Sequence, residues 1–143
     1  MNTNKFLVGG IIGGVANFLL GWLVWGTLLM NFMNEHTTAT GKSAMRGETE
    51  MIWWALIVAN LVLGFFLSYI VGRAGIKTAG AGASFGAVAG LLMAISIDLF
   101  NYAFLDLSDT TGIIVDVLAS MVVTAIVCAI IGWFYGRGSA AAA

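Results

Sequence analysis

The chain of 143 residues has no proline, one cysteine and one histidine. Without proline, a kink in any long helix has to arise from glycine or from an inserted side chain. The single cysteine, Cys128, excludes an internal disulfide, a CxxC redox pair and a thiolate metal cluster, and we interpret it as a small packing residue. The single histidine, His36, has no second imidazole or thiolate to complete a transition-metal site. We therefore expect no metal and no other cofactor.

Charged side chains are also scarce. Only 9% of the residues are charged, whereas a soluble domain carries about 25%. The formal net charge of −1 argues against a nucleic-acid partner, because neutralising phosphates requires a basic surface. Hydrophobic residues make up 60% of the chain, which indicates that its main partner is the lipid bilayer.

Four long apolar stretches fill most of the sequence. A bilayer core is crossed by roughly 20 apolar residues in helical form, because lipid offers no partner for free backbone groups. The first stretch is longer than the roughly 7–15 residues of a signal-peptide core, so we interpret it as a retained span. The pattern predicts an all-α membrane protein, a four-transmembrane-helix bundle that forms a single domain over residues 1–138. The expected spans are 6–32, 51–72, 79–105 and 112–135, with an outer loop at 33–50 and a small-residue tail at 139–143 that is either native or appended.

The basic residues indicate how the spans are oriented. Four of them fall on the side of the two termini and two fall on the opposite side. Under the positive-inside rule this places both termini in the cytoplasm. We therefore expect a multi-pass protein of the bacterial cytoplasmic (inner) membrane. The basic residues on the side of the termini are Lys5, Arg73, Lys77 and Arg137, and those opposite are Lys42 and Arg46.

The longest loop, 33–50, is then outside. It is polar and has neither a helical nor a strand period, so we expect it to be mobile. His36 lies in this loop, and we interpret it as an ordinary solvated residue rather than a ligand.

Two similarities suggest an internal repeat. The second and fourth spans both close with aromatic residues followed by Gly-Arg, at Gly72-Arg73 and Gly136-Arg137. The first and third spans both begin rich in glycine and become aromatic toward the outer side. We interpret the chain as two parallel-repeat helical hairpins. The alternative is that each span acquired its anchor independently, since aromatic and basic residues mark many membrane boundaries.

Glycines in the first and third spans recur every four residues, which places them on one helical face. Such small-residue faces allow helix backbones to approach closely in lipid. Because both faces lie in the cytoplasmic half, we expect spans 1 and 3 to be close there and to diverge around a cleft on the outer side. The competing use of the face in span 3 is an interface with another chain, such as a homodimer. The predicted helix-packing residues are Gly10, Gly14, Gly82, Gly86 and Gly90.

Asp98 and Asp116 are the only charged residues well inside the predicted spans. At a rise of about 1.5 Å per residue they lie roughly 10 Å and roughly 6 Å from the outer boundary. A carboxyl group in the membrane is costly, so it is a candidate functional residue by default. If the two faced each other, they would share a proton. The alternative is a structural role, because Asp116 also suits the positive N-terminal end of a helix.

Polar and aromatic side chains gather at the level of these carboxyl groups. Asn101 shares a helical face with Asp98, and Tyr102 follows it. Trp22 and Trp25 lie in the outer part of span 1, and Trp22 is the deeper of the two. This combination predicts a ligand-binding cleft with polar contacts and aromatic walls. The predicted ligand-binding residues are Asp98, Asp116, Asn101, Trp22, Trp25 and Tyr102.

The chain resembles a family of small bacterial four-span membrane proteins described as a domain of unknown function. The resemblance covers most of residues 6–137. It implies a four-span fold and brings no established activity with it. The features that carry it are the Trp22–Trp25 region, the polar outer loop, Asn101-Tyr102 at the end of span 3 and Ile114-Val115-Asp116 at the start of span 4.

Our leading hypothesis from the sequence is an outward-facing polar and aromatic cleft that binds, senses or translocates a small or amphipathic ligand. The alternative is a non-catalytic assembly or scaffold subunit that packs through the glycine face of span 3 as a homo-oligomer. An enzyme is not expected and no catalytic residue is assigned, because no nucleophile–base pair or metal set accompanies the carboxyl groups.

Overall fold

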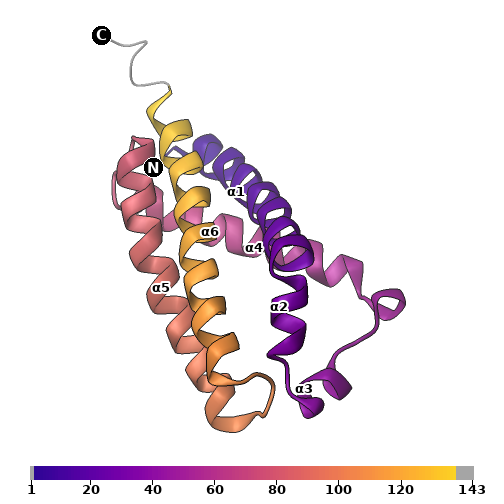
Figure 1. Cartoon of the computed structure of the whole chain (residues 1–143). Helices are drawn as coiled ribbons and strands as arrows, with labels where there is room; N and C mark the ends of the chain where they lie inside the picture. Colours follow the sequence, from indigo (N-terminus) through magenta and orange to yellow (C-terminus); the bar gives the residue numbers. More distant parts are fainter. Residues whose placement is uncertain (1, 138–143) are drawn as a thin grey trace.

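The computed structural model describes residues 2–137, apart from the side chain of Glu48. The predicted tail at 139–143 and the last residue of the predicted domain lie outside the described residues. Helices make up nearly all of the regular structure (Figure 1). In chain order they are α1 (Thr3–Leu23), the π-helical segment η1 (Val24–Leu28), α2 (Met30–Glu35), α3 (Ala39–Ala44), the 3₁₀ segment η2 (Glu48–Glu50), α4 (Trp53–Arg73), α5 (Ala79–Phe104) and α6 (Thr110–Gly136).

The prediction of an all-α protein with four membrane-spanning helices is confirmed. Four segments are long and apolar enough to cross a membrane. Their ends differ by a few residues from the predicted ends where capping side chains fix them. Asn2 begins α1 by accepting a hydrogen bond from the Asn4 amide, and Asp109 begins α6 by accepting one from the Gly112 amide. The four segments are Thr3–Leu28, Trp53–Arg73, Ala79–Phe104 and Thr110–Gly136.

The long helices pack as two pairs, α1 with α4 and α5 with α6, and α6 also packs against α1 and α4. In Figure 1, α5 and α6 run side by side, α1 starts near the top of α6 and slants away from it on the side opposite α5, and α4 passes behind. We call the end of the bundle with Lys5, Lys77 and Arg137 the basic end. The opposite end, with Asp106 and Asp109, is the acidic end.

The glycine face of α5 is covered by α6 of the same chain. Gly82, Gly86 and Gly90 are all buried in α5. A Cβ atom on Gly86 would lie 2.5 Å from the Thr124 carbonyl oxygen, and one on Gly90 would lie 2.6 Å from Thr124 Cβ. Only glycine permits this approach of the two backbones. The face therefore has no room for a second chain, which removes the surface that the homodimer interpretation required.

The glycines of α1 pack against α4 rather than α5. Gly10 lies against the ring of Phe65, and a Cβ atom on Gly14 would lie 2.9 Å from Leu61 Cα. Gly64 of α4 faces back toward both glycines. The glycines of spans 1 and 3 therefore do not bring these two spans together, because each face is covered by the next membrane-spanning helix along the chain, α4 for α1 and α6 for α5.

The bundle is packed most closely toward its basic end. Leu67, Val71, Val127 and Ile131 are fully buried there. Ser68 Oγ and Tyr135 Oη are 2.6 Å apart, and the Ser68 hydroxyl also lies 2.9 Å from the carbonyl oxygen of Phe6 in α1. Toward the acidic end, every side chain of α4 from Trp53 to Ala59 except Ala55 is exposed.

Candidate functional site

The two intramembrane carboxyl groups come together. Asp98 on α5 lies beside Asp116 on α6. In the stretch 95–104 of α5, Asp98 is the only side chain that is not exposed. Its Oδ2 atom is buried and has no hydrogen-bond donor among the described residues. Two ionised carboxylates are acceptors only, so a single shared proton, or a cation, would satisfy this atom.

Trp25 brings a third helical segment to the carboxyl pair. Its indole Nε1 donates a hydrogen bond of 2.6 Å to Asp116 Oδ1. Trp25 lies in η1, where the amide of Leu29 bonds to the carbonyl of Val24 at 2.7 Å, five residues back. A π-helical turn of this kind is rare and occurs frequently at functional sites. The π-helical turn therefore contains Trp25, the residue that holds Asp116.

A small cavity opens beside Asp98. Its volume is about 90 Å³. One water molecule needs roughly 10–15 Å³ on this measure, so the cavity has room for several waters or a small cation. Drug-sized ligands need roughly 300–1,000 Å³, which excludes an amphipathic ligand of that size from this space. The cavity is lined by Asp98, Asn101, Tyr102, Leu105, Leu107, Ser108 and Ile113.

Five of the six predicted ligand-binding residues therefore gather at one place. Asp98, Asn101 and Tyr102 line the cavity, while Trp25 and Asp116 lie beside it. The sixth residue, Trp22, does not take part, because its side chain is 65% exposed on the outside of α1. Trp22 belongs to α1, whereas Trp25 lies in the π-helical turn that follows it.

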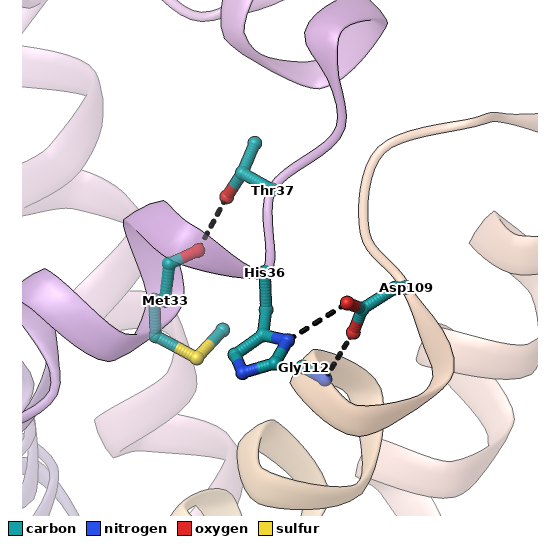
Figure 2. Close-up of polar contacts among 5 residues, drawn as sticks. All are labelled: Met33, His36, Thr37, Asp109 and Gly112. Atoms are coloured by element: carbon teal, nitrogen blue, oxygen red, sulfur yellow. Dashed lines mark hydrogen bonds and ion pairs between the residues drawn. The ribbon is translucent and has the colours of Figure 1, made fainter.

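A loop contact that the sequence did not predict closes the acidic end (Figure 2). His36 Nδ1 lies 2.7 Å from Asp109 Oδ2, and the Asp109 amide donates to the His36 carbonyl at 3.0 Å. The other carboxylate oxygen, Asp109 Oδ1, accepts from the Gly112 amide at 2.8 Å. The Gly112 amide, followed by the His36 ring, holds the pKa of Asp109 below its ordinary value. We call His36 and Asp109 the clasp.

The clasp belongs to a wider contact between the 33–50 loop and the α5–α6 loop. The Thr38 amide donates to the Leu107 carbonyl at 3.0 Å, and Thr37 pairs with Ser108 in an isolated antiparallel bridge. Leu107 and Ser108 are also walls of the small cavity. The interpretation of His36 as an ordinary solvated residue is therefore wrong, and the part of the loop around it supports one wall of the site.

A metal centre finds no support in the geometry. Among residues 2–137, no group of three or more His, Cys, Asp and Glu side chains is placed to hold a metal ion. The carboxyl pair offers oxygen ligands from two residues only. The groups present suit a proton or a monovalent cation better than a transition metal.

Comparison with family models, with curated proteins and with solved structures finds no match. The resemblance to the small four-span family therefore stays a prediction. The functional argument rests on the geometry of the site.

Proposed function

We propose that this multi-pass protein binds a small cationic ligand at the Asp98–Asp116 carboxyl pair. The basic end faces the cytoplasm of a bacterial inner membrane, as the four basic residues there favour, so the cavity opens to the outside. The observation that carries the proposal is the buried Asp98 Oδ2 atom, which has no donor among the described residues and lies next to a second carboxyl group.

The physical argument is electrostatic. Two ionised carboxylates in a low-dielectric environment repel each other, so the pair holds either a proton or another positive charge. When a cation enters the cavity, the shared proton leaves to water and the charge of the site is unchanged. Tyr102 adds an aromatic ring, which can attract a cation, and Asn101 adds an amide oxygen. The cavity of about 90 Å³ favours an alkali ion or a small amine over an amphipathic molecule.

Binding or sensing is favoured over conduction through the bundle. Val127 and Ile131 of α6 are fully buried and fill the interior of the bundle on the basic side of the carboxyl pair. Passage of the ligand would require these contacts to open. The assembly alternative loses support because Gly82, Gly86 and Gly90 already pack against α6.

Titration of the purified full-length protein in lipid nanodiscs tests the proposal. The probes are sodium chloride, potassium chloride and methylammonium chloride, followed by calorimetry and by proton release to a pH-sensitive dye. At least one cation is expected to bind with release of protons. Asp98→Asn is expected to weaken that binding about ten-fold or more and to abolish the proton release, as loss of a charged partner does.

Asp106→Asn is the matched control, because Asp106 is an exposed carboxylate in the adjoining loop. It is expected to bind as the wild type does. The proposal fails if the wild type binds none of the cations, or if Asp98→Asn and Asp106→Asn behave alike.

A further inference from the structure

A second cavity, of about 180 Å³, lies at the basic end. Three parts of the chain that are distant in sequence form it: the start of α1, the end of α4 with the loop that follows it, and the end of α6. Its chemistry differs from that of the small cavity beside Asp98, because it is lined by two lysines instead of a carboxyl group. The residues that line it are Asn2, Lys5, Gly72, Gly75, Ile76, Lys77 and Tyr135.

Lys5 is held in place by α6. Its ammonium group donates to the carbonyl oxygen of Tyr135 at 3.2 Å. Tyr135 is itself buried, and its hydroxyl group lies 2.6 Å from Ser68 Oγ. An ammonium group has three donors, so Lys5 keeps donors for a ligand after the bond to Tyr135. The half-buried Lys5 is therefore positioned at the cavity rather than free in solvent.

Lys77 is held in place through its backbone. Gly75 has a φ of +69° and turns the chain out of α4, and the Ile76 amide bonds back to the Val71 carbonyl at 3.2 Å. The Lys77 carbonyl then lies directly against Gly136 of α6, where a Cβ atom would not fit. This contact between the Lys77 backbone and α6 places Lys77 at the same cavity as Lys5.

The positive charge of this cavity is not compensated within the described structure. No acidic side chain lines it, and neither lysine forms an ion pair in the part of the chain that the structure describes. The seven Asp and Glu residues of the sequence all belong to the acidic half or its loops. The natural occupant is therefore an anion.

We propose that the basic cavity binds the phosphate of an anionic phospholipid headgroup. The cavity lies where α1 begins and where α4 and α6 end, which is the level of the headgroups for helices that cross the bilayer. Basic pockets between membrane helices on the cytoplasmic side suit such headgroups, and lysine binds phosphate as a point charge. The same chemistry would accept free inorganic phosphate, so the experiment compares the two sources. The site is independent of the carboxyl pair.

Native mass spectrometry of the full-length protein in detergent provides the test. The protein is titrated with phosphatidylglycerol, with phosphatidylcholine and with inorganic phosphate. We expect phosphatidylglycerol to be retained in preference to phosphatidylcholine. Lys5→Gln and Lys77→Gln are each expected to weaken phosphatidylglycerol binding about five-fold, the effect of one lysine at a charged membrane surface.

Lys42→Gln is the matched control, since it removes one exposed lysine at the acidic end. It is expected to leave lipid binding unchanged. Lys77→Gln keeps the test valid if Lys5→Gln folds poorly, because Lys77 is exposed and its backbone, which the change keeps, lies against Gly136 of α6. Lysine-dependent binding of inorganic phosphate with no lipid preference would make the free anion the ligand. The proposal is overturned if phosphatidylglycerol has no advantage, or if Lys42→Gln weakens its binding as much as Lys77→Gln.

Discussion

The indole Nε1 of Trp25 donates a 2.6 Å hydrogen bond to Oδ1 of Asp116, which ties the π-helical segment of the first span to the start of the fourth. The bond fixes the carboxyl group of Asp116 beside Asp98. The geometry of the candidate site therefore depends on a residue from a third helix.

Replacing Trp25 with Phe tests this dependence. The change leaves a charged acceptor without its donor, and we expect it to lower the free energy of unfolding by about 1–3 kcal/mol. Thermal unfolding in detergent measures the effect. Trp22→Phe is the control, because Trp22 is 65% exposed, and it should change little. Equal effects of the two substitutions would contradict the role assigned to Trp25.

Asp98→Asn should separate stability from ligand binding. The amide of Asn donates a hydrogen bond to the carboxylate of Asp116 and removes the repulsion between the two acids. We expect the unfolding temperature at neutral pH to equal or exceed that of the wild type, although cation binding is lost. A large fall in the unfolding temperature would mean that Asp98 has a structural role.

Gly86→Ala should disrupt the contact between α5 and α6. The new Cβ atom would lie 2.5 Å from the Thr124 carbonyl oxygen, so the helices have to move apart, at a cost of about 1–3 kcal/mol. Gly80→Ala is the matched control, since a Cβ atom there meets nothing within 4 Å. Unfolding of the two variants in detergent gives the comparison. A loss of stability in Gly80→Ala equal to that in Gly86→Ala would contradict the packing explanation, because alanine favours a helix more than glycine does.

A polar pair between α1 and α4 provides a fourth test. Asn17 Nδ2 donates to Asn60 Oδ1 at 2.7 Å. A double-mutant cycle with Asn17→Ala and Asn60→Ala should give a coupling energy of about 0.6 kcal/mol, the usual value for such bonds between membrane helices. Steric-trapping or denaturant unfolding supplies the four stabilities. A coupling energy of zero would mean that the two amides act independently.

The clasp should open in acid. The folded-state pKa of Asp109 is below its ordinary value of 3.8, so its contribution is present above that value and is lost as the pH falls through the folded pKa. The mobility of a spin label on Ser43→Cys in α3 should therefore rise below about pH 3.8. Asp109→Asn keeps a cap for α6 but has no charge, and its loop should show no such transition. An identical transition in both proteins would assign it to another carboxyl group.

Much of the fold was predictable from the sequence. The bilayer requires about 20 apolar residues per span, and this requirement alone located all four helices to within a few residues. The cost of a charge in lipid likewise singled out Asp98 and Asp116, which the structure brings together. Helical spacing added Asn101, which lines the same cavity as Asp98.

The errors have physical causes as well. A spacing of four identifies a small-residue face but not the helix that covers it. The sequence was therefore compatible with a dimer through the glycines of α5, whereas in the structure α6 covers them. The π-helical turn at Val24–Leu28 has no signature in the sequence, and it carries Trp25, which reaches the site, whereas Trp22 of α1 is exposed. The contact between His36 and Asp109 joins residues from two loops that no periodicity relates.

The sequence by itself determined that this protein lies in a membrane, how many times it crosses, and which charged groups are costly enough to matter. These properties follow from the transfer of single side chains and backbone groups into lipid, which depends on composition along the chain. Only the tertiary structure decided which faces meet and which donors reach which carboxylates. In lipid these choices depend on close packing between specific surfaces, and packing is a property of pairs of helices.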